Sequence, residues 1–371
     1  MTAQQDLPAA PPPPAARTRV PAQWPRRIRF LRIGGISLKI DLATVAITVA
    51  LLLIALVVGT WALGVSTTAS PHLRFGEILG VLVGQVAGDP AKRVAAALPA
   101  VLVAALGGAS LALSGGIFQT ITRNPLGSPD IIGFTTGAYT GALIALLVLN
   151  AGSSGAMIGA LLGSLLTGVA VYWFGMRGGT GGYRLVVVGV GIAAMLTAFN
   201  GYLIATSNLQ NAASAAAWGI GNLRDLRMAD TVPILITLLI LVPLLVIVAP
   251  RMRMFELGPD SAQSKGVDVG RARLYLLLLG VGFAAATTAV AGPIAFVALV
   301  APQVAARISP APGIPLVTSA AVGAALLVIC DTIARTILAP TTQLPVGVVT
   351  TAVGGAYLLG LLLVQARKAG S

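Results

Sequence analysis

Charge is scarce in this sequence: only 9% of its 371 residues are Asp, Glu, Lys or Arg, whereas 56% are apolar. A soluble protein of this length needs far more charge to cover its surface, so the composition excludes an ordinary soluble domain. Cysteine and histidine are scarcer still, with one residue of each, Cys330 and His72. A single cysteine excludes both an internal disulfide and a cysteine metal cluster.

Apolar residues instead come in long blocks that contain no charged residue. Each block can hold a helix of the roughly 20 residues that cross a hydrocarbon core, and none alternates like a membrane β-strand. Two blocks are expected to hold a pair of spans, because small or helix-breaking residues interrupt them at 150–155 and 291–293. The sequence therefore predicts an all-α membrane protein with ten transmembrane helices. The blocks are 42–73, 94–122, 131–176, 185–223, 231–250, 274–306, 308–330 and 336–366.

The distribution of positive charge predicts the orientation. With the N-terminus inside, the inner segments 1–41, 121–130, 176–184, 250–273, 307–314 and 366–371 carry 18 of the 24 Lys and Arg residues. An even number of spans keeps both termini in the cytoplasm. Residues 1–40 are Pro/Ala-rich and then basic, so we expect a disordered cytoplasmic tail before a transmembrane domain of residues 41–371. The net charge of +13 follows largely from these inner segments, which meet anionic lipid, and does not indicate nucleic-acid binding.

Few polar groups inside the blocks have the chemistry of a coupled carrier or an enzyme. Asp331 and Arg335 lie four residues apart, on the same helix face. The sequence is consistent with two roles for them, a structural ion pair and a part in transport. A proton- or sodium-coupled carrier needs more buried carboxylates or histidines than this. No catalytic residues and no metal site are expected, and no Gly-x-x-x-x-Gly-Lys-Ser/Thr loop is present to bind ATP. Gly155, Gly159 and Gly163 share one helix face and indicate close packing against a neighbour.

Segment 250–273, with the sequence PRMRMFELGPDSAQSKGVDVGRAR, is the most informative polar stretch. Pro259 is placed to open a short helix of about two turns that ends at Gly266. A short helix between two spans, rich in small polar residues, suits docking onto a cytoplasmic partner. An ordinary solvated connector is the alternative that the spacing leaves open.

Three stretches resemble the FecCD permease family, the membrane subunits of importers for siderophores, haem and vitamin B12. They are residues 111–134 (LALSGGIFQTITRNPLGSPDIIGF), 291–302 (AGPIAFVALVAP) and 344–350 (LPVGVVT). The resemblance covers about residues 40–367. It implies the BtuC-like type II ABC importer fold of ten helices. It also implies a second permease subunit, a related FecCD-family chain, and two ABC ATPases that hold ATP and Mg²⁺, so this chain needs no cofactor of its own.

The resemblance also implies roles for individual residues. Residues 257–266 match the coupling segment that seats in the ATPase: Leu257, Gly258, Asp260, Ser261, Ala262 and Gly266. An extracytoplasmic siderophore-binding lipoprotein is expected to dock on the outer side of the membrane. Segment 207–228, which is expected to form a short helix at the outer surface, is one candidate for this contact. The candidate docking residues are Arg74, Glu77, Lys92, Arg93, Arg224 and Arg227. The sparse polar residues of the expected pathway are Gln119, Asn124, Pro125, Asn200, Tyr202 and Gln303.

Gln303 and residues 124–134 resemble most the permeases for ferric enterobactin-type siderophores. The expectation is thus a ferric siderophore importer of the bacterial cytoplasmic membrane. Members commonly carry Arg-x-Pro-Arg where this chain has Ala97-Leu98-Pro99-Ala100, which removes positive charge near the outer mouth. A haem or vitamin B12 importer of the same architecture, a secondary transporter and an intramembrane hydrolase or transferase are the alternatives.

Overall fold

The computed structural model describes residues 28–33, 36–65, 72–176, 182–256, 258–311, 313–338 and 343–369. The chain divides into two compact units, Met1–Leu42 and Ala43–Ser371, and each is described by itself.

The first unit contains an antiparallel pair of strands, β1 (Ile28–Ile33) and β2 (Ile36–Asp41). Ile33 pairs with Ile36 and Leu31 with Leu38. We expected residues 1–40 to be disordered throughout, and the strands depart from that expectation. The sequence signal of a two-residue hairpin is a Gly-Gly pair followed by apolar and polar residues in alternation over residues 36–41, and the basic composition of the segment hid it.

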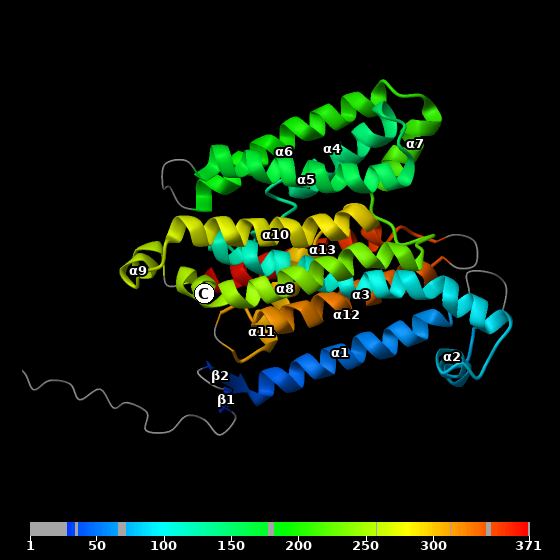
Figure 1. Cartoon of the computed structure of the whole chain (residues 1–371), viewed down its shortest axis with the longest axis horizontal. Helices are drawn as coiled ribbons and strands as arrows, with labels where there is room; N and C mark the ends of the chain where they lie inside the picture. The colour runs from blue at the N-terminus through cyan, green and yellow to red at the C-terminus, as the bar shows by residue number, and fades with distance from the viewer. Residues whose placement is uncertain are drawn as a thin grey trace, which may run out of the picture. The chain divides into compact units, whose positions relative to one another are not determined.

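The second unit is helical (Figure 1). Eight of its described helices are long and apolar enough to cross a membrane, and two shorter apolar helices accompany them. Together they match the ten expected segments, although the two short helices make ten an approximate number of spans. The long helices are α1 (Leu42–Leu63), α3 (Asp89–Thr122), α5 (Gly152–Met176), α6 (Gly182–Ala205), α8 (Met228–Glu256), α10 (Val269–Ala291), α12 (Leu316–Thr336) and α13 (Val346–Ala369).

The shorter elements lie where the sequence interrupts its apolar blocks. One short apolar helix is α4 (Phe134–Leu143), continued by the π-helix η1 (Ile144–Val148), and the other is α11 (Val297–Ile308). Both expected interruptions are confirmed, since α5 starts at Gly152 and α10 ends at Ala291 before Gly292. The remaining helices are α2 (Phe75–Leu82), α7 (Leu209–Trp218) and α9 (Pro259–Ser264), of which α7 is the short helix expected in segment 207–228.

Helix α3 is the centre of the packing: it lies against α8, α10, α11 and α12, and α4 pairs with α5 (Figure 1). Small residues allow these approaches, because a Cβ on Gly115 would stand 1.6 Å from the carbonyl oxygen of Ala298. The expected glycine face of α5 is confirmed in part. Gly159 and Gly163 meet α4, whereas the atom nearest Gly155 belongs to Ala151 of the preceding turn.

Large apolar side chains cover the outside of the second unit. Leu56 of α1, Leu239 of α8 and Leu363 of α13 expose 61%, 66% and 63% of their surface. Apolar patches of this kind are too large for a protein in water and fit contact with lipid chains. By contrast, residues of α10 such as Phe283 (0%) are buried in the bundle.

The close approach of α3 and α11 can be tested at Gly115. Gly115→Ala places a methyl group into the Ala298 carbonyl, so we expect a loss of about 1–3 kcal/mol in the free energy of unfolding. Gly355→Ala is the matched control, because no atom lies within 4 Å of its Cβ position. Thermal unfolding of both purified variants in one detergent measures the difference. Equal stability of the two variants would contradict the packing described here.

Candidate functional site

The segment between α8 and α10 forms the short helix that the sequence predicts. Helix α9 begins at Pro259 and ends at Ser264. Gly258 precedes it with φ +98° and Gly266 follows with φ +76°, both in the region that favours glycine. Leu257, also expected in this segment, lies outside the described residues. The two glycines set α9 off from the long helices on either side.

Ala262 attaches α9 to its surroundings. It is 0% exposed, its N–H donates to the Gly258 carbonyl at 3.0 Å, and its carbonyl accepts from the Val267 N–H at 3.1 Å. Ser261 is exposed on the same helix, and Asp260 occupies its second position. One face of α9 therefore packs on its own chain, while Ser261 remains open to a partner.

The end of α3 lies near Gly258, a proximity that the sequence does not reveal. Arg123 ends α3 in the left-handed conformation, with φ +49°. Its Nη1 atom lies 3.7 Å from the position of a Cβ on Gly258. The helices on either side of α9 also meet. The guanidinium of the buried Arg273, in α10, lies 5.9 Å from the centre of the Phe255 ring, in α8. Arg123 belongs to the first family-like stretch, but no spacing rule connects it to a residue 135 positions away.

Two of the expected pathway residues are joined to each other. The Gln303 side-chain amide donates to Gln119 Oε1 at 2.7 Å, and the Gln119 amide donates to the Leu299 carbonyl at 3.0 Å. Gln119 is 3% exposed. The pair links α3 to α11 and satisfies a carbonyl of α11 inside the bundle.

The other four expected pathway residues lie elsewhere. Asn124 and Pro125 are in the exposed loop after α3, where Asn124 Oδ1 accepts from the Leu126 N–H at 2.9 Å. Asn200 of α6 is 4% exposed, and its Oδ1 atom has no hydrogen-bond partner among the described residues. Tyr202, two residues further on, is 63% exposed. The six residues therefore do not form one cluster within this chain.

Asp130 connects the loop after α3 to the start of α11. The Thr135 hydroxyl donates to its Oδ1 at 2.5 Å, and a backbone N–H of Phe296 donates to the same carboxyl group. Burial raises the pKa of Asp130 above its ordinary value of 3.8, against the effect of these two donors. Phe296 itself adopts φ +69°, so the carboxyl group supports a left-handed residue.

The residues expected to meet a binding protein lie on α2, at the start of α3 and before α8. The backbone N–H of Arg74 donates to Glu77 Oε2 at 2.7 Å, which begins α2. Arg224 is half-buried, and its Nε and Nη2 atoms have no hydrogen-bond partner in the part of the chain that the structure describes. Arg93 is half-buried as well, whereas the remaining members are exposed: Arg74, Glu77, Lys92 and Arg227.

The second and third family-like stretches meet at the loop after α7. The Asn222 N–H donates to the Ala291 carbonyl at 2.8 Å, and the Gly347 N–H donates to the Gly221 carbonyl at 3.2 Å. A Cβ on Gly347 would stand 1.6 Å from the Ile220 carbonyl oxygen. The sequence shows both stretches but not the loop at 220–222 that joins them.

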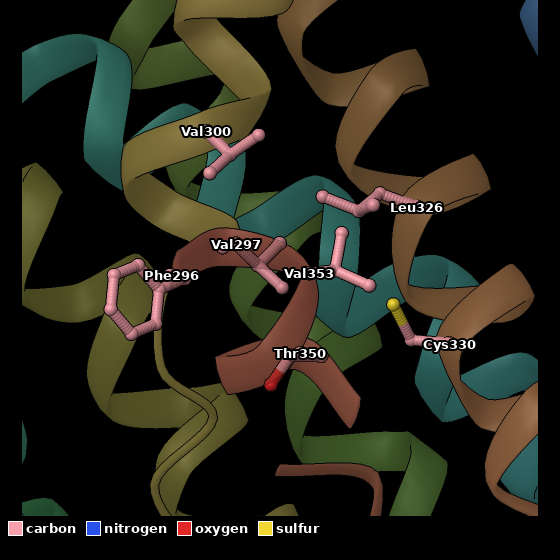
Figure 2. A pocket seen from close by; sticks show the side chains of 8 residues that line it. Phe296, Val297, Val300, Leu326, Cys330, Thr350 and Val353 are labelled. Carbon is pink, nitrogen blue, oxygen red and sulfur yellow. The ribbon is translucent and has the colours of Figure 1, made fainter. Parts of the chain in front are cut away.

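A narrow apolar gap lies between α11 on one side and α12 and α13 on the other. Figure 2 shows Val297 and Val300 on one side of it, with Leu326, Cys330 and Val353 on the others. The gap leaves no room for a water molecule. It therefore provides no binding site for a ligand in this conformation.

The model of the FecCD transport family matches residues 43–364, most of the chain. This chain belongs to the FecCD transport family. Among its relatives, the ferric enterobactin permease FepG of Escherichia coli K12 is 42% identical over 87% of this chain and 97% of its own. The achromobactin permease CbrC of Dickeya dadantii is 37% identical over 90% of this chain and 96% of its own. Relatives named for cobalamin and hemin transport are less similar.

A solved structure confirms the fold expected for a FecCD chain. An inward-facing metal-chelate type ABC transporter superposes with a TM-score of 0.74, at 24% identity, over 86% of this chain and 99% of its own. In this structure the second stretch that resembles FecCD proteins forms the start of α11, and the first and third contribute residues that lie against it. Ala97 and Ala100, the positions where the resemblance to the family implies arginines, lie in α3, where Ala100 is only 4% exposed.

The Asp331–Arg335 pair is confirmed as an ion pair, with Oδ2 and Nη2 2.7 Å apart and both side chains largely buried. Arg335→Gln should lower the free energy of unfolding by about 3–5 kcal/mol, because it leaves a buried carboxylate unpaired. The double variant Asp331→Asn/Arg335→Gln should recover most of that loss. Chemical denaturation in detergent gives both values. If the single and double variants lose the same amount, burial of the unpaired charge is not the cause.

Proposed function

We propose that this chain is the membrane-spanning permease of an ABC importer that carries a ferric siderophore of the enterobactin type into the cytoplasm. Its similarity to the ferric enterobactin permease, over nearly the full length of both chains, carries the proposal. The iron stays inside its chelator during passage, so the permease needs no iron ligands of its own. Among the described residues, no three His, Cys, Asp or Glu side chains lie close enough together to bind a metal ion.

ATP hydrolysis in two partner ATPases, which bind ATP and Mg²⁺, supplies the energy in this proposal. The exposed side of α9 is the proposed contact with them, supported by its separation from the long helices by Gly258 and Gly266 and by the exposure of Ser261. Helix α9 contacts α8 and α10, and α10 packs on α3. Movement of α9 would thus reach the helix at the centre of the bundle through α10.

The assembly also includes a second permease subunit and an extracytoplasmic siderophore-binding lipoprotein. The exposed charges of Arg74, Glu77, Lys92 and Arg227 support the docking of that lipoprotein on the outer side. We place the substrate pathway between two permease subunits, where the exposed Tyr202 is available to line it. The protein spans the bacterial cytoplasmic membrane with both termini inside.

The cargo is tested by uptake. The assay uses vesicles that contain this chain, its partner permease and the two ATPases. The vesicles should accumulate iron-55 that is supplied as a catecholate chelate bound to its binding protein. Accumulation should require ATP on the side of the membrane where the ATPases lie. Haemin and cobalamin should not accumulate. Uptake of either of these in place of the chelate would assign the other cargo, and uptake driven by a proton gradient without ATPases would indicate a secondary transporter.

The coupling role of α9 is tested at Gly266. Gly266→Ala forces an alanine into φ +76°, at a cost of about 1–2 kcal/mol to the local conformation, so transport and substrate-stimulated ATP hydrolysis should both fall severalfold. The control is Gly270→Ala in the first turn of α10, where the nearest atom to a Cβ is 3.5 Å away. Membrane insertion should be the same for both. Unchanged coupling in Gly266→Ala would argue against this role.

A further inference from the structure

A groove of about 310 Å³ opens between the end of α8 and the start of α10. Arg251 of α8 contributes to one side of its lining, and Asp268, Arg271 and Tyr275 come from the start of α10. Neither the proposed cargo pathway nor the expected binding-protein surface includes these residues, whereas Gly266, at the end of the coupling segment, also lines the groove. The groove is large enough to admit a ligand.

The lining of the groove is positively charged. Arg251 and Arg271 carry two positive charges, and Asp268 is its acidic residue. Asp268 is engaged twice by Arg271: its Oδ2 lies 3.3 Å from Arg271 Nε, and its Oδ1 accepts the Arg271 backbone N–H at 3.0 Å. Both side chains of that pair are largely exposed, so water screens it. A net positive charge remains for an anionic ligand.

The groove also lies at the edge of the apolar surface. On α10, Tyr275 and Leu278 follow Arg271 at helical spacing on one face, and each exposes 48% of its surface. On α8, Val246 and Ile247 expose 66% and 65% shortly before Arg251. Tyrosine is enriched at the boundary between lipid chains and headgroups, because its ring is apolar and its hydroxyl polar. The groove therefore opens at the depth of phospholipid headgroups.

We propose that this groove binds the phosphate of an anionic phospholipid, with Arg251 and Arg271 contacting the phosphate and Tyr275 beside the glycerol and acyl chains. A soluble anion accounts for the arginines but not for the continuous apolar surface next to them. A lipid accounts for both, since basic pockets between membrane helices recognise lipid headgroups in this way. The site does not depend on the cargo, but it adjoins the proposed coupling segment, because Gly266 also lines the groove.

Native mass spectrometry of the purified full-length chain tests the site, with phosphatidylglycerol and phosphatidylcholine as probes. Wild-type protein should bind phosphatidylglycerol more tightly than phosphatidylcholine. R251Q and R271Q should each weaken phosphatidylglycerol binding about five-fold, the effect of one arginine near an anionic lipid. R251K, which keeps the charge, should bind like wild type and shows that a change at this position is tolerated.

R253Q is the matched control. Arg253 is exposed in the same last turn of α8 but does not line the groove, so its loss should change binding less than two-fold. Three results would overturn the proposal: equal binding of the two lipids, equal weakening by R253Q and R251Q, or displacement of the lipid by millimolar inorganic phosphate. Loss of ATPase co-purification in R251Q and R271Q, with lipid binding unchanged, would instead assign the groove to a protein contact.

Discussion

A helix that breaks inside an apolar bundle leaves backbone N–H and C=O groups that no bulk water can satisfy, at several kcal/mol for each. The break between α10 and α11 is of this kind. The Ala291 carbonyl accepts from the Asn222 N–H, the Leu299 carbonyl accepts from Gln119, and a Phe296 N–H donates to Asp130. The partners come from two distant segments, the first family-like stretch and the loop at Asn222, so the break depends on contacts with both.

This requirement explains why the stretches that resemble the FecCD family lie together. The first supplies Gln119 and Asp130, the second is the break itself, and the third supplies Gly347, which pairs with the loop beside Asn222. Polar side chains in these stretches thus have a structural role in addition to any contact with cargo. Gln119 shows this most clearly, because both ends of its amide are bonded within the chain.

Local patterns were sufficient to predict the helices, because a membrane imposes length and apolar composition on each one separately. The interruptions at Gly152 and Gly292 and the short helix at Pro259 also follow from local residue types. Contacts between distant segments have no such signal: nothing in the sequence pairs Arg123 with Gly258, or Asn222 with Ala291. For the same reason, the sequence does not show how the expected pathway residues lie relative to one another, since polarity alone does not place a residue.

The contacts of α11 also suggest which parts move together during transport. On one side α11 is held to α3 by Gln119 and Gln303, and α3 ends at Arg123 beside Gly258. On the other side an apolar gap lies between α11 and α13, and Arg307 of α11 places its guanidinium 5.5 Å from the centre of the Tyr357 ring of α13. If the ATPases act through α9, the polar contacts favour α11 moving with α3, while the apolar gap changes shape.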